Sequence, residues 1–268
     1  MNDSIKETSV EARKSIVSPR LDRMFADLYK VYQFILQFFK EAFLPPYEGK
    51  EIMRQCFEVG VKSLPLITLT GFITGLVFTK QSRPSLEEFG AASWLPNLIS
   101  IAIVRALAPL VTALICAGKV GSNIGAELGS MRVTEQIDAM EVSATNPFKF
   151  LVVSRVIATT LMIPILSMYT GFVGLMGSFL NIHQNELTSM TTFFEGAFDS
   201  LTFLDLFATL IKATLFGFTI GIVGCYQGYF SSKGTEGVGK AANSAVVVAM
   251  FLIFIEETIV VQIVAALR

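Results

Sequence analysis

The chain has 268 residues, of which 52% are hydrophobic, 16% are charged and 23 are phenylalanine. A soluble domain carries about a quarter charged residues, so this composition excludes an ordinary soluble protein and indicates a membrane protein. The net charge of -1 leaves no basic excess to neutralise phosphates, which excludes a nucleic-acid partner. The single histidine, His183, rules out a metal site built from several histidines.

Residues 1–20 have no apolar core and carry several acids, so they resemble neither a signal peptide nor a transit peptide. We predict a disordered cytosolic lead there and one all-α membrane domain over 21–268. The segment 21–44 is long enough to cross a bilayer, but its polar residues recur every three or four positions and form one continuous stripe. Because that stripe suits headgroups rather than hydrocarbon, we predict an interfacial helix.

Five later segments are apolar enough to cross a bilayer core about 30 Å thick, which takes roughly 20 residues of helix. They are residues 59–80, 97–117, 150–180, 203–230 and 244–267. The connections on the side of the N-terminus hold fourteen Lys and Arg residues, against three on the other side. The positive-inside rule therefore predicts a cytosolic N-terminus and a C-terminus outside.

Glycines recur at a spacing of four within these segments, which is typical of closely packed membrane helices. The sets are Gly71/Gly75, Gly121/Gly125/Gly129, Gly217/Gly221 and Gly224/Gly228.

The segment 132–147 is charged although it lies between two apolar spans. Thr134 is placed to cap a short helix, with Glu135 and Gln136 in its first turn. An acidic amphipathic helix on the cytosolic side suits docking of a motor protein, while a plain surface helix is the alternative. The candidate coupling residues are Thr134, Glu135, Gln136, Asp138 and Glu141.

The stretch Gly234–Lys240 matches the glycine-rich part of a phosphate-binding loop. Ala241 stands where that loop needs Ser or Thr for magnesium, and a membrane helix rather than a strand precedes it. The chain is therefore expected to carry no ATPase site and no cofactor, so ATP and magnesium would bind on a partner chain.

Several runs resemble the signature of the MlaE-type permeases, the membrane subunits of ABC transporters that work with MCE-domain proteins. These runs are Ala117–Ser122, Ala126–Met131, Val133–Met140, Asn146-Pro147 and the loop Glu236–Ala241. The resemblance covers about residues 20–268.

The resemblance implies an interfacial helix, five spans and a coupling helix between spans two and three, in a homodimer of the bacterial inner membrane with a periplasmic C-terminus. It further implies phospholipid as substrate, a cytosolic ABC ATPase as partner and a periplasmic MCE-domain protein. One departure is that the family's Arg-Glu-Leu-Gly-Pro reads Arg105-Ala-Leu-Ala-Pro109 here, so a role of that glutamate is absent or taken over elsewhere.

Ionisable residues within spans are costly and point to function. At about 1.5 Å per residue, Arg105, Lys212 and the pair Glu256/Glu257 lie roughly 12–17 Å from the outer ends of three spans. These four residues are the candidate substrate-binding set, with Arg105, lacking its neighbouring glutamate, assigned to the lipid phosphate. A set of pairs that only neutralise one another is the alternative. No nucleophile and base stand together, so no catalytic residue is expected.

Two rival functions remain open at this level. A secondary transporter or channel could use Glu256 and Glu257 to carry protons, although the repeats typical of such proteins are not visible. A structural anchor subunit would leave the buried charges unexplained.

Overall fold

The computed structural model describes residues 19–45, 47–186, 189–232 and 234–266. The expected disordered lead lies outside the described residues except for positions 19 and 20, which begin a helix. Every regular element in the described part is helical, which confirms the predicted all-α class. The chain divides into two units, with the boundary in the sequence between Phe43 and Leu44.

The first unit contributes α2 (Pro19–Phe43) to the described residues. It is not one of the five described helices that are long and apolar enough to cross a membrane. Its placement in the membrane interface stays a prediction.

The second unit contains those five helical segments, as predicted. They are Gly49–Glu88, Leu95–Val133, Phe148–Gln184, Phe203–Tyr229 and Thr235–Ala266. Most extend well beyond the apolar stretches visible in the sequence, because helical structure continues through amphipathic residues at their ends.

The first segment consists of α3 (Gly49–Val59), a short 3-10 turn η1 (Val61–Ser63) and α4 (Leu64–Glu88). Pro65 explains the break, since proline lacks the N–H of a continuous helix but fits its first turn.

The second segment alternates between α-helix and π-helix. After a short 3-10 turn η2 (Ala92–Trp94), its parts are α5 (Leu95–Ala102), η3 (Ile103–Leu107), α6 (Ala108–Cys116), η4 (Ala117–Gly121) and α7 (Ser122–Val133). The π-helical turns η3 and η4 contain Arg105 and Lys119 respectively. Such turns are rare and often mark functional positions.

The chain then forms α8 (Gln136–Val142), the π-helical turn η5 (Phe148–Val153) and α9 (Ser154–Glu186). The short α10 (Met190–Asp199) follows and was not predicted. It docks through Phe193, which is fully buried in one apolar cluster with Leu95, Ile99 and Ile182. The last helices are α11 (Phe203–Tyr229) and α12 (Thr235–Ala266).

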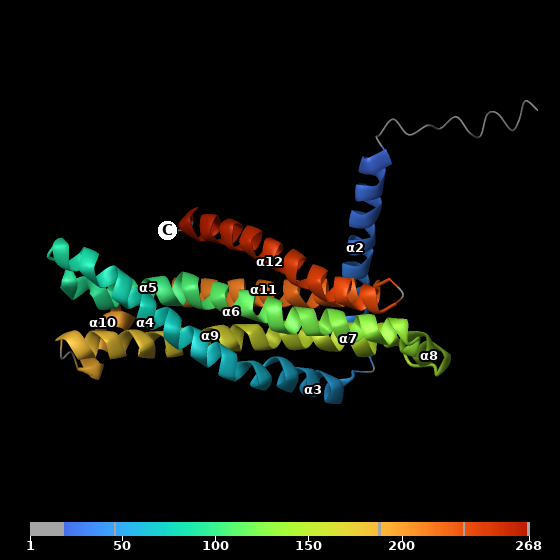
Figure 1. Cartoon of the computed structure of the whole chain (residues 1–268), viewed down its shortest axis with the longest axis horizontal. Coiled ribbons are helices and arrows are strands. Elements are labelled where there is room, and N and C mark those ends of the chain that lie inside the picture. The colour runs from blue at the N-terminus through green and yellow to red at the C-terminus, as the bar shows by residue number, and fades with distance from the viewer. Residues whose placement is uncertain (1–18, 46, 187–188, 233, 267–268) are drawn as a thin grey trace, which may run out of the picture. The chain divides into compact units, whose positions relative to one another are not determined.

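In the second unit α9 is the most buried of the membrane segments and α12 the least. α9 packs along α4 and α11, and α12 packs on α11 and α7 (Figure 1). The predicted glycine faces make these contacts. A Cβ on Gly75 would overlap the carbonyl oxygen of Gly174 in α9, and one on Gly228 would overlap Leu128 in α7.

Candidate functional site

Arg105 lies in the π-helical turn η3, four residues before Pro109. In an α-helix the Arg105 carbonyl would accept from the N–H of residue 109, but proline has none. Lys212 Nζ, from α11, donates to this carbonyl at 3.0 Å. A proline in one span thus creates an acceptor for a buried cation of another.

The Arg105 guanidinium forms an ion pair with Asp205, with 3.1 Å between Nε and Oδ1. Asp205 is almost fully buried, whereas the Arg105 side chain is about a third exposed. The other carboxylate oxygen of Asp205 accepts from the backbone N–H and the hydroxyl of Thr202, and so caps the start of α11. Arg105 is therefore not the free cation that the sequence suggested.

Lys212 also pairs with Glu257, at 2.7 Å between Nζ and Oε1. Glu256 bonds instead to the hydroxyl of Thr219. The second oxygen of each glutamate, Oε2, is buried and has no hydrogen-bond partner in the described part of the chain. Two carboxylates thus retain accepting capacity inside a membrane segment, where unpaired polar groups are costly.

A cavity of about 210 Å³ opens at this layer, lined by Arg105, Asp205 and Lys212 together with small and apolar residues of α5, α11 and α12. A second cavity of about 230 Å³ shares Thr209 with it and is lined almost wholly by apolar side chains of η3, α6, α9, α10 and α11. Thr209 donates to the carbonyl of Val104 between them. A polar cavity and an apolar one therefore lie next to each other.

The structure brings together three of the four predicted substrate-binding residues through direct contacts of Lys212 with the Arg105 carbonyl and with Glu257. Glu256 lies next to Glu257 in the chain but bonds to Thr219, not to Lys212. Asp205 was missed as a member of this cluster. Its signal was present, because Thr202 and Asp205 have the spacing of a capping box at the start of a span.

Between spans two and three, the turn that joins α7 to α8 differs from the one that we predicted. Thr134 does not cap the new helix: it ends α7, and its hydroxyl donates to the carbonyl of Ser130. Glu135 stands before the helix, not in its first turn, and has a left-handed backbone with φ of 58°. The prediction failed because a threonine hydroxyl bonds equally well to the carbonyl four residues earlier.

α8 itself has the predicted amphipathic character. Ile137 is fully buried, whereas Gln136, Asp138 and Glu141 are exposed. Asp138 forms an ion pair of 2.6 Å with Arg132, which holds α8 against the end of α7. The sequence analysis did not single out Val142, an apolar side chain that is 89% exposed at the end of α8.

The described residues contain no group of three or more His, Cys, Asp or Glu residues that could hold a metal ion. The chemistry that the buried cluster offers is recognition of charge.

Comparison with known proteins decides the family. The family model for Permease MlaE matches residues 52–263 of this chain. The chain belongs to the MlaE permease family. A probable ABC transporter permease protein of Rickettsia typhi is 39% identical over 219 residues, covering 81% of this chain and 84% of that protein.

Two relatives come from photosynthetic organisms. A probable ABC transporter permease protein of Synechocystis is 37% identical over 221 residues, covering 81% of this chain and 84% of the relative. The chloroplastic protein TRIGALACTOSYLDIACYLGLYCEROL 1 of Arabidopsis thaliana is 32% identical over 208 residues, covering 78% of this chain and 59% of the relative.

This MlaE permease is thus a multi-pass ABC transporter permease, a kind of subunit that works with an ATPase. The Rickettsia and Synechocystis relatives are named as permease proteins, which suggests a non-enzymatic membrane subunit here.

Proposed function

We propose that this permease moves phospholipid between the inner and outer membranes of a bacterial cell, and that the layer around Arg105 and Lys212 receives the lipid headgroup. The observation that carries the proposal is the cavity in which Arg105, Asp205 and Lys212 meet apolar walls inside a membrane span. A lipid phosphate can compete with Asp205 for the guanidinium, because arginine presents parallel donors that match phosphate oxygens. The adjoining apolar cavity suits an acyl chain.

The comparisons support a lipid cargo and ATP as the energy source. The Arabidopsis relative is named after a glycolipid, and the Rickettsia relative is named an ABC transporter permease. These names favour an ATP-driven lipid permease over a secondary transporter that uses Glu256 and Glu257 for protons.

In this proposal a cytosolic ABC ATPase binds ATP and magnesium and docks on α8. The acids Glu135 and Glu141 and the exposed Val142 provide charged and apolar contacts for it. Thr134, Gln136 and Asp138 complete the coupling segment, Asp138 by holding the α7–α8 turn.

A second copy of the chain and an MCE-domain protein complete the proposed assembly. The second copy would cover α12, the least buried span, where Glu256 and Glu257 each keep an oxygen without a partner. The MCE-domain protein would dock at the periplasmic end, opposite α8.

The test measures phospholipid phosphorus per purified permease and ATP-dependent lipid transfer in vesicles that contain the permease with its ATPase. Ala208→Phe fills the polar cavity and leaves every ion pair in place, so we expect normal assembly with little bound lipid. Arg105→Lys keeps a charge for Asp205 but removes the planar donors, so transfer should fall about tenfold.

The matched control is Thr214→Phe, at an exposed position of α11 that lines neither cavity, which should behave like the unaltered protein. Normal lipid content and transfer in both Ala208→Phe and Arg105→Lys would assign the charged layer to scaffolding and refute the proposal.

A further inference from the structure

The helix α3 buries two polar side chains and exposes two large apolar ones. Glu51 and Gln55 are buried, whereas Met53 and Phe57 are more than half exposed. The exposed apolar stripe continues along α4 through residues such as Leu69. A helix that exposes apolar side chains along one continuous stripe faces lipid, so a bilayer leaflet covers the outer side of α3.

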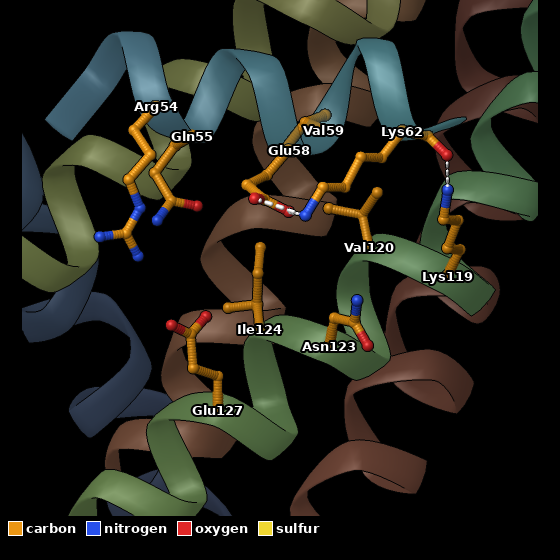
Figure 2. Close-up of a pocket in the computed structure, with 10 residues that line it drawn as sticks. All are labelled: Arg54, Gln55, Glu58, Val59, Lys62, Lys119, Val120, Asn123, Ile124 and Glu127. Carbon is orange, nitrogen blue, oxygen red and sulfur yellow. Dashed lines mark hydrogen bonds and ion pairs between the residues drawn. The ribbon is translucent and has the colours of Figure 1, made fainter. Parts of the chain in front are cut away.

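Beneath this helix lies a cavity of about 280 Å³ between α3 and α7. Arg54 and Glu58 reach into it from α3, and Asn123 and Glu127 reach into it from α7 (Figure 2). At the other end of the cavity Lys119, in the π-helical turn η4, donates to the carbonyl of Lys62 (Figure 2). The cavity is polar although it adjoins a lipid-facing helix.

The cavity and an adjoining one that shares Arg54 and Glu127 carry an excess of positive charge. Among the described lining residues the cations are Arg54, Lys62, Lys119 and Arg155, and the carboxylates are Glu51, Glu58 and Glu127.

The carboxylates are committed to ion pairs. Glu127 pairs with the buried Arg155 at 2.9 Å, and Glu58 pairs with Lys62 at 2.6 Å. Glu51 accepts from Gln55 at 2.7 Å and pairs more loosely with Arg54, at 3.4 Å.

Lys119 donates its hydrogen bond to a neutral group, the carbonyl of Lys62. Among the described residues no carboxylate is in direct contact with Lys119, and Arg54 has a single, long ion pair with Glu51. Both cations retain N–H donors for an anion that enters the cavity.

We propose that this cavity binds the anionic phosphate headgroup of a lipid in the leaflet that covers α3, with the acyl chains lying along Met53 and Phe57. The site is separate from the one around Arg105, which lies fourteen residues and about 20 Å away along the same helix. Arg54 and Lys119 are its phosphate donors, and Asn123 contributes an amide.

The first test measures binding of phosphatidylglycerol, phosphatidylcholine and inorganic phosphate to the permease purified with its ATPase, by native mass spectrometry. Arg54→Gln combined with Lys119→Gln should weaken phosphatidylglycerol binding at this site about tenfold, because two charge-assisted hydrogen bonds are lost. Lys50→Gln combined with Lys80→Gln removes two exposed cations that do not line the cavity. This control should change phosphatidylglycerol binding less than twofold.

Equal binding by the two double variants would overturn the site. Loss of inorganic phosphate binding with unchanged phosphatidylglycerol binding would show a site for a free anion and refute the lipid assignment. Lipid transfer by Arg105→Lys tests the layer around Arg105, whereas the Arg54 and Lys119 variants test this cavity, so failure of the proposed function and failure of this site are distinguishable.

A second measurement keeps every charge in place. Asn123→Cys in a Cys56→Ser background is exposed to a water-soluble thiol reagent in vesicles of phosphatidylcholine, with and without phosphatidylglycerol. The anionic lipid should slow the reaction several-fold, about fivefold per unit of favourable charge, and should leave Ala139→Cys on α8 unaffected. The same rate at Asn123→Cys in both vesicles would refute the proposal even if the cation variants fail to fold.

Discussion

Asp205 divides its two carboxylate oxygens between two tasks. One oxygen caps the start of α11 through Thr202, and the other pairs with Arg105 of the neighbouring span. Lys212 in turn joins the Arg105 carbonyl to Glu257. At the scale of residues, the start of α11, the π-helical turn η3 and α12 are therefore held by one connected polar cluster.

The pairing of Lys212 leads to a prediction that separates the two adjacent glutamates. Lys212→Met leaves Glu257 without its cation, and breaking a buried pair costs about 3–5 kcal/mol. We expect a low yield of folded, monodisperse protein, measured by size-exclusion chromatography. Adding Glu257→Gln should restore much of the yield, whereas adding Glu256→Gln should not, because Glu256 bonds to Thr219.

The reverse result, with rescue by Glu256→Gln alone, would mean that Lys212 pairs with Glu256 in the membrane. Thr214→Ala, at an exposed position of α11, is the control for the effect of altering that helix.

At the scale of elements, α8 begins after a tight turn, and no described side chain caps its first residues. The turn needs a left-handed backbone at Glu135, and the ion pair of Arg132 with Asp138 closes it. Because Asp138 stabilises the turn, reversing its charge would disturb α8 itself. A test of docking has to leave Asp138 in place.

We predict that Glu141→Lys combined with Val142→Ser detaches the ATPase while the permease stays folded in the membrane. Reversing a charge at an interface costs binding energy through like-charge contact, and the loss of the apolar contact adds to it, so we expect binding to weaken at least about tenfold. The measurement is the amount of ATPase that co-purifies with tagged permease. The matched control is Glu88→Lys with Phe89→Ser, an exposed acid beside an exposed apolar residue at the end of α4.

Full recovery of the ATPase with the α8 variant would rule out α8 as the docking element. Equal loss with the control would show a general defect and would also count against it.

At the scale of the whole molecule, the fourteen cations on one side predict which ends face the cytosol. Single cysteines placed in a Cys56→Ser background test this with a membrane-impermeant maleimide on cells whose inner membrane is intact. Glu195→Cys on α10 should react, whereas Ala139→Cys on α8 and Asp27→Cys on α2 should react only after permeabilisation. Labelling of Ala139→Cys in intact cells would show that the topology is the reverse of the predicted one. Labelling of Asp27→Cys would show that α2 crosses the membrane.

The sequence by itself determined the class, the number of spans and the family. Each rests on a property that accumulates along the chain: apolar length sets a span, glycine spacing sets close packing, and the motif runs identify an MlaE permease. The family and the five spans were confirmed. The candidate charges were also visible, because a charge inside an apolar run stands out without any partner being known.

Only the tertiary structure decided which charges meet. The choice between Glu256 and Glu257 for Lys212, and the pairing of Arg105 with Asp205, depend on how α11 and α12 rotate about their axes. One residue of helix turns a side chain by about 100°, and packing against other spans sets that rotation. The burial of Glu51 and Gln55 in α3 and the cavity beneath that helix were hidden for the same reason: periodicity shows that a helix has two faces, but only its neighbours show which face is buried.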